Sequence, residues 1–183
     1  MSLAVLFFEV RGTRCALPVA VVREVLAAPH VTPVPGAPAP LRGLVPVHGQ
    51  VLPLLDVGPA LTMGTGDATA SLLAASALRP YGDQIVVVES ELPSGDATTD
   101  DPFAAARRPP VRAALVANRV MRLGRIEEGH SWRPPPGPGF VRATVLDAEG
   151  PALLLDAGLA LDQLRDFVMQ TQLRHFVEGV VPV

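Results

Sequence analysis

Residues 40–61 read PLRGLVPVHGQVLPLLDVGPAL, and residues 140–161 repeat this stretch without a gap as FVRATVLDAEGPALLLDAGLAL. Each copy contains an apolar run, a short turn with glycine, a second apolar run and an Asp-x-Gly sequence, which predicts two strands joined by a tight turn. The repeat therefore predicts two similar β modules in one small protein. Eight of the 22 positions are identical: Arg42/Arg142, Val45/Val145, Leu54/Leu154, Leu55/Leu155, Asp56/Asp156, Gly58/Gly158, Ala60/Ala160 and Leu61/Leu161.

The repeat also extends upstream, where LPVAVVREV (17–25) aligns with LVANRVMRL (115–123) at an offset of 98. We expect a first module over residues 1–63, a connector with a short helix over 64–83, and a second module over 84–161. The second module differs by an insertion, 90–110, which has little apolar pattern and is predicted to be a mobile loop. Apolar residues at helical spacing then predict a C-terminal helix and tail over 162–183.

The composition excludes several classes of function. The net charge is −3 and aromatic residues make up 4% of the chain, which argues against a general nucleic-acid binder. No apolar run is long enough to cross a bilayer, and the N-terminal residues read as a first strand rather than a leader, so we expect a cytoplasmic protein without membrane insertion. The single cysteine excludes an internal disulfide, and the four histidines have no metal-ligand spacing. We expect no metal and no cofactor.

An ordered series of motifs in the first copy closely resembles the CheW-like family of bacterial chemotaxis coupling proteins, over about residues 3–161. The family pattern has an acidic residue in a Val-x-Glu-Val step, a proline loop, a hairpin and a Val-x-Pro-Val-x-Asp-Leu run. The matching residues here are Val22-Arg23-Glu24-Val25, Val34-Pro35, Gly43-Leu44-Val45, His48-Gly49 and Val51-Leu52-Pro53-Leu54-Leu55-Asp56.

The resemblance implies a mainly β fold of two small five-stranded SH3-like barrels around a shared hydrophobic centre, and no enzymatic activity. It also implies an adaptor that links the cytoplasmic tip of a methyl-accepting chemoreceptor to the regulatory domain of a histidine kinase. The chain departs from the family at His48, where the family has an arginine that can pair with the acidic residue matched by Glu24. A neutral imidazole cannot make a bidentate bond to a carboxylate, and a protonated one could make a single bond that depends on pH.

We single out six residues as candidates for partner binding: Val22, Glu24, His48, Gly49, Arg119 and Arg122. Glu24 is either a solvated charge or a partner-contact carboxylate, and His48 either fills a turn or belongs to an interface. Arg119, Arg122 and Arg125 form either a solvated face or a docking patch for an acidic partner. Arg122 is equivalent to Glu24 in the repeat, and opposite charges at equivalent sites would suit head-to-tail contact between barrels.

Other repeated residues are interpreted as structural. Asp56 and Asp156 each precede a glycine, and we expect them to accept backbone N–H bonds in the turn that leaves the strand. Gly43 is placed with them as a turn residue. Arg42 and Arg142 are expected to anchor the two hairpin bases, with a role in an interface as the alternative. The two aspartates could also suggest acid–base chemistry, and this enzyme hypothesis is kept as a competitor.

Two hypotheses without catalysis remain. In the first, an apolar groove between the barrels near Val22 receives a helical receptor tip and separate faces bind the kinase, which recruits the protein to receptor arrays. In the second, the protein is a specialised adaptor that binds a receptor or a motility or positioning partner without activating the kinase. His48 and the insertion motivate the second hypothesis.

Overall fold

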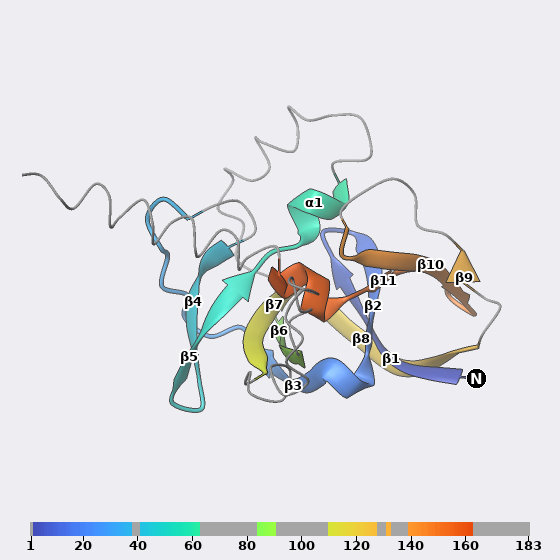
Figure 1. Ribbon diagram of the computed structural model, residues 1–183, viewed down its shortest axis with the longest axis horizontal. Helices are drawn as coiled ribbons and strands as arrows, with labels where there is room; N and C mark the ends of the chain where they lie inside the picture. The colour runs from blue at the N-terminus through green and yellow to red at the C-terminus, as the bar shows by residue number, and fades with distance from the viewer. Residues whose placement is uncertain are drawn as a thin grey trace, which may run out of the picture.

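The computed structural model describes residues 2–37, 41–62, 84–90, 110–127, 131–132 and 139–162. The predicted connector, residues 91–109 of the insertion and the predicted C-terminal helix beyond residue 162 lie outside these residues. The described part is mainly β and forms two sheets (Figure 1).

Sheet A has the strand order β8 (Arg119–Glu127), β1 (Ser2–Val10), β2 (Thr13–Pro18), β11 (Gly150–Leu155), β10 (Val141–Asp147) and β9 (Ser131–Trp132). Sheet B has the order β3 (Val22–Ala27), β6 (Gln84–Ser90), β7 (Val111–Ala117), β5 (Gln50–Leu55) and β4 (Leu41–Val47). Within the residues that the structure describes, three short helical segments follow strands: the 3₁₀ turn η1 (Val19–Val21), α1 (Gly58–Thr62) and residues 157–162.

The two sheets exchange strands between the two copies of the repeat. Strands β1–β2, β3 and β4–β5 of the first copy correspond to β6–β7, β8 and β10–β11 of the second. Sheet A joins β1–β2 to β8, β10 and β11, and sheet B joins β6–β7 to β3, β4 and β5, in the same order. Each of the expected modules, 1–63 and 84–161, therefore contributes strands to both sheets.

In each sheet, one parallel strand pair joins the strands of one copy of the repeat to those of the other, and the two parallel pairs involve equivalent strands. Strand β2 pairs with β11 through Cys15↔Leu153 and Ala16↔Leu154. Strand β7 pairs with β5 through Ala114↔Leu54 and Leu115↔Leu55. All eight of these residues are apolar, and such residues suit strands that are covered on both faces.

Alternation along the strands divides the apolar residues among three clusters. In β1, Val5 and Phe7 face the inside of sheet A, whereas Leu6, Phe8 and Val10 face a core shared by both sheets. That common core also contains Leu17, Leu55, Val86, Leu115 and Leu155. Sheet B has its own cluster around Val45, Leu54 and Val87. The fold class predicted from the sequence is confirmed, with two SH3-like modules on one hydrophobic centre, although the described ladder of sheet B does not run continuously from β3 to β4.

Candidate functional site

The base of each repeated hairpin is held by an arginine–aspartate pair. Arg42 donates from Nε (3.0 Å) and Nη2 (2.7 Å) to Asp56 Oδ2, and Arg142 Nε donates to Asp156 Oδ2 at 2.6 Å. A register shift falls at each arginine, between Leu41 and Gly43 in one copy and between Val141 and Ala143 in the other. The bulge turns both arginines toward the end of the neighbouring strand, where the aspartates lie.

The same aspartates cap the turns that leave β5 and β11. Asp56 Oδ1 accepts the backbone N–H of Gly58 at 3.0 Å, and Asp156 Oδ1 accepts that of Leu159 at 2.9 Å. Both carboxylates are thus engaged in structural contacts at the hairpin bases and the turns that follow.

The first copy has a second arginine that sequence reasoning missed. Arg11, in the β1–β2 turn of sheet A, donates from Nη2 to Asp56 Oδ2 at 2.7 Å. Burial alone would raise the pKa of Asp56, but hydrogen bonds from Arg11 and Arg42 and their charges outweigh it and hold this pKa below its ordinary value. Asp56 therefore ties sheet A to sheet B as well as bracing its own hairpin.

The tip of the β4–β5 hairpin meets strand β3. His48 and Gly49 have φ of 46° and 79°, which matches a two-residue turn of type I′. His48 Nε2 lies 2.8 Å from Glu24 Oε2. The Glu24 side chain is 30% exposed and that of His48 is 72% exposed. Two of the predicted partner-binding residues are thus brought together.

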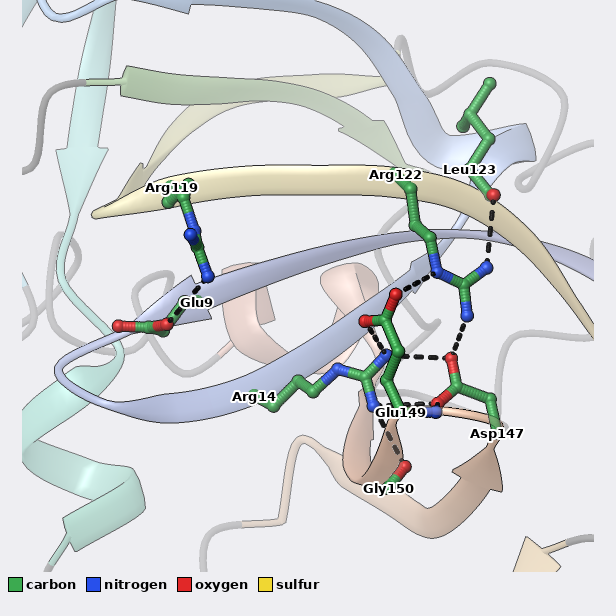
Figure 2. Close-up of polar contacts among 8 residues, drawn as sticks. All are labelled: Glu9, Arg14, Arg119, Arg122, Leu123, Asp147, Glu149 and Gly150. Carbon is green, nitrogen blue, oxygen red and sulfur yellow. Dashed lines mark hydrogen bonds and ion pairs between the residues drawn. The ribbon is translucent and has the colours of Figure 1, made fainter.

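At the equivalent tip of the β10–β11 hairpin, the acidic and basic side chains are exchanged between the strand and the hairpin (Figure 2). Here the strand supplies the cation, since Arg122 Nε donates to Glu149 Oε1 at 3.1 Å and its Nη2 donates to Asp147. Arg14 adds a bidentate pair to Asp147, at 2.7 and 2.8 Å, and further bonds to Glu149 and the Gly150 carbonyl.

The sheet A network is anchored on a buried ring. The guanidinium carbons of Arg14 and Arg122 each lie 4.8 Å from the centroid of Phe7, a geometry suited to cation–π attraction. Burial alone would raise the pKa of Asp147, but bonds from Arg14 and the Glu149 backbone N–H, with the charges of both arginines, lower it. Arg122 is therefore engaged within the chain.

The predicted basic stripe does not form one face. Arg122 lies opposite Phe7, on the inner face of sheet A, whereas Arg125 lies opposite Ala4. Arg119 is 67% exposed and approaches Glu9 at 3.8 Å (Figure 2). The alternation of side chains along the strand places Arg125 on the opposite face of sheet A from Arg122.

A further network on sheet B was also missed. Glu89 on β6 accepts hydrogen bonds from Arg23 (2.7 Å) and Arg112, and these bonds, that from Arg112 foremost, lower its pKa. Arg112 Nη1 also lies 3.4 Å from Gln50 Oε1 at the hairpin tip. When the offset of 98 is carried further upstream than residues 17–25, it aligns Arg14 with Arg112, so the sequence contained a signal for both networks.

Gly43 is not a turn residue, and this prediction is corrected. It lies inside β4 beside the bulge, and a Cβ there would stand 2.4 Å from the Thr32 carbonyl oxygen. Glycine is required because the backbone after β3 approaches here, where Thr32 and Leu44 exchange backbone hydrogen bonds of 2.9 and 2.8 Å.

Both hairpins carry exposed apolar residues on the side that, deeper in the molecule, joins the common core. Val51 is 66% exposed and pairs with the exposed Pro46, and at equivalent positions Leu146 is 43% exposed and pairs with the exposed Pro151. Val22, at the start of β3, is partly buried against the common core. Val51 with Pro46, and Leu146 with Pro151, each form an apolar surface on their hairpin, and we call these two surfaces the hairpin faces.

The described residues contain no group of three or more His, Cys, Asp or Glu placed to hold a metal ion. No helix in this part of the chain has the length and apolar character needed to cross a membrane. Cys15 is fully buried, and burial raises the pKa of its thiol to about 12.

The geometry defines a class of protein in which two β modules of the same topology exchange strands and share one hydrophobic core. Residues 4–165 match the family model for the CheW-like domain, and the chain belongs to that family. Among solved structures it is similar to the scaffolding protein TtCheW from Thermoanaerobacter tengcongensis, with 18% identity, 86% of each chain covered and a TM-score of 0.59. That likeness shows the fold. No curated protein sequence matches the chain.

Proposed function

We propose that this protein is a non-catalytic adaptor of bacterial chemotaxis, which couples the cytoplasmic tip of a methyl-accepting receptor to the regulatory domain of a histidine kinase in receptor arrays. Membership of the CheW-like family supports the adaptor role. The observation that carries the proposal is the pair of exposed hairpin faces, because clustered apolar residues on a surface mark sites of protein interaction.

The two hairpin faces give the adaptor two separate surfaces of similar apolar character, and the two hairpin tips differ in charge. The tip of the hairpin with Val51 contacts Glu24 through His48, and the tip of the hairpin with Leu146 contacts Arg122 through Glu149. Different charges beside similar apolar residues allow two partners to be distinguished. The region around Val22 and the face with Val51 would receive the receptor tip, and the face with Leu146 would bind the kinase domain.

Calorimetry with a purified receptor-tip fragment and a kinase regulatory domain tests the proposal. We expect Val51→Glu to weaken receptor binding at least tenfold and Leu146→Glu to weaken kinase binding to a similar extent, since each places a charge in an apolar contact. Leu3→Glu is the matched control, because Leu3 is 40% exposed but lies outside both hairpins. Absence of binding to either partner by the unmodified chain would refute the proposal.

A second candidate is an adaptor that binds a receptor or a motility or positioning partner without activating the kinase. It is favoured by the Glu24–His48 contact, a single hydrogen bond to a mostly exposed imidazole. An arginine at this position could hold Glu24 through two bonds. A kinase assay with the unmodified chain and His48→Arg distinguishes the two candidates: activation only by the variant supports the second, and equal activation by both supports the first.

A further inference from the structure

The inner faces of the two sheets differ at one pair of equivalent positions. Strands β8 and β3 correspond at the offset of 98, which makes Gly124 equivalent to Leu26. Phe7 on β1 and Val87 on β6 are equivalent too, because they lie opposite residues of β8 and β3 that are themselves related by this offset. Sheet A thus has a large residue beside glycine where sheet B has two residues of intermediate size.

The Phe7 ring occupies the space beside β8 that a side chain at Gly124 would fill. A Cβ added at Gly124 would stand 2.7 Å from Phe7 Cε2, 3.2 Å from Phe7 Cδ2 and 2.7 Å from Nη1 of Arg122. Phe7 is fully buried, so its ring cannot move aside without disturbing the packing around it. In sheet B the equivalent Leu26 packs against that sheet's own cluster. Glycine at 124 is therefore the condition for the position of the ring.

The same ring lies beneath both arginines that hold the β10–β11 tip. The guanidinium carbons of Arg14 and Arg122 are each 4.8 Å from the centroid of Phe7. Both arginines bond to Asp147 and Glu149 (Figure 2). A cation is attracted more strongly to a ring when the pair is removed from solvent, and the Arg14 side chain is 14% exposed. A continuous series of contacts thus joins strand β8 to the hairpin tip through the ring.

The β4–β5 tip of sheet B has fewer contacts among the described residues. Arg112 is 49% exposed and bonds to Glu89 on β6, so its link to the hairpin is a 3.4 Å contact with Gln50. His48 adds one contact of 2.8 Å to strand β3. A valine stands at the position equivalent to the ring, and it offers no π face to a cation.

We propose that Phe7 and Gly124 are positioning residues for the β10–β11 hairpin, because together they place one aromatic ring beneath both arginines of its tip. The hairpin face with Leu146 is then rigid before a partner binds, whereas the face with Val51 adjusts its shape on binding. A surface that is already ordered loses less conformational entropy when it binds. The consequence for partners rests on the proposed adaptor function, and the difference in rigidity belongs to the chain itself.

Amide hydrogen exchange of the full chain, followed by NMR, tests the difference in rigidity. The reporters are the amides of Glu149 and Gly150, compared with those of Gly49 and Gln50 at the equivalent positions of the other tip. We expect Glu149 and Gly150, relative to their intrinsic rates, to exchange about five- to thirtyfold more slowly, which is the range that two cation–π contacts supply. Equal protection at the two tips would overturn the proposal.

A double variant transfers the sheet B pair to sheet A. Phe7→Val with Gly124→Leu keeps the number of side-chain carbon atoms and removes the ring, so we expect the protection of Glu149 to fall to that of Gly49. Phe7→Leu removes the ring and leaves the glycine, and it should show the same fall; it decides the question if the double variant does not fold. Val5→Ile is the matched control, because it introduces the sheet B residue at a neighbouring inner position and leaves the ring in place.

The outcomes separate a positioning role from a general effect on packing. A ring shifts the NMR signals of groups over its face upfield, so the side-chain signals of Arg14 and Arg122 should lose this shift in Phe7→Leu and keep it in Val5→Ile. A tip that stays protected without the ring, or that loses protection equally in Val5→Ile, would overturn the proposal.

Calorimetry with the kinase regulatory domain tests the consequence for binding. We expect Phe7→Leu to weaken this binding by up to about thirtyfold and to leave binding of the receptor tip unchanged. Unchanged kinase binding alongside faster exchange at the tip would refute the docking role of the face with Leu146. The exchange measurement needs no partner, so failure of the positioning role and failure of the proposed function are distinguishable.

Discussion

Asp56 and Asp156 occupy equivalent positions in the repeat but have different surroundings. The Asp56 side chain is 6% exposed and pairs with Arg11 and Arg42, whereas that of Asp156 is 20% exposed and pairs with Arg142, itself 63% exposed. When one member of a buried ion pair is removed, the charge of the remaining member is left without a partner. The loss of folding free energy is then much larger than when a pair exposed to solvent is broken. The repeat therefore offers a natural pair of buried and exposed contacts.

We expect Asp56→Asn to lower the free energy of unfolding by about 2–4 kcal/mol at neutral pH, and Asp156→Asn by at most about 1 kcal/mol. Urea denaturation followed by circular dichroism measures both. Because the folded state lowers the pKa of Asp56, its contribution is present above the unfolded pKa of about 3.9 and is lost as pH falls through the folded value. The difference between the unmodified chain and Asp56→Asn should thus shrink in acid, and equal losses for both variants would contradict this assignment.

Gly43 tests how closely the backbone at Thr32 approaches strand β4. A Cβ at Gly43 would stand 2.4 Å from a backbone oxygen, whereas at Gly36, which also has a positive φ of 72°, nothing lies within 4 Å. We expect Gly36→Ala to cost about 1–2 kcal/mol from the left-handed backbone alone, and Gly43→Ala to cost clearly more. Thermal denaturation of the two variants checks the order, and similar melting temperatures would show that the strands shift to accept the methyl group.

At the scale of elements, the hairpin tips of the two sheets use equivalent arginines in different ways. Arg14 is 14% exposed, spans Asp147, Glu149 and the Gly150 carbonyl, and lies over Phe7; Arg112 is 49% exposed and bonds to Glu89 and Gln50. We expect Arg14→Gln to destabilise the protein by about 2–3 kcal/mol and Arg112→Gln by at most about 1 kcal/mol. Chemical denaturation of the two variants measures this difference, and a larger loss for Arg112→Gln would contradict the network in Figure 2.

The hairpins themselves could be predicted from the sequence, because the alternation, the glycine turn and the Asp-x-Gly sequence all act locally. The turn at His48 and Gly49 is where the pattern placed it. The exchange of strands could not be predicted. Strands β1–β2 and β6–β7 are both apolar on two faces, so either pairing would bury the same residues, and local pattern does not distinguish them.

The candidate site could be predicted only in part, because some of its contacts join residues that are far apart in the sequence. Glu24 and His48 were selected from the family resemblance, and the structure places them in contact. Arg11 and Arg14 were missed because each pairs with an acid far away in the sequence, at separations of 45 and 133 residues or more. Such pairs depend on the strand exchange, so their prediction had to await the topology.

On the scale of the whole molecule, the shared core determines how the two sheets unfold. Residues from both sheets form it, with Phe8 and Leu155 from sheet A beside Leu55 and Leu115 from sheet B. Arg11 adds a polar link from the β1–β2 turn to Asp56 at the end of β5. Neither sheet can separate without exposing apolar surface of the other, which predicts one cooperative transition.

Phe8→Ala tests this coupling, because Phe8 is fully buried in the common core. We expect a loss of about 3–5 kcal/mol, with amide signals of both sheets disappearing at the same urea concentration. Val45→Ala, in the separate cluster of sheet B, should lower the midpoint of both sheets by a smaller amount, and Val51→Ala, at an exposed position, should leave it unchanged. If sheet B melted before sheet A in Val45→Ala, the two sheets would be independent folding units. Coinciding midpoints of the two sheets within each variant would instead mean that a change in the cluster of one sheet alters the stability of the whole molecule.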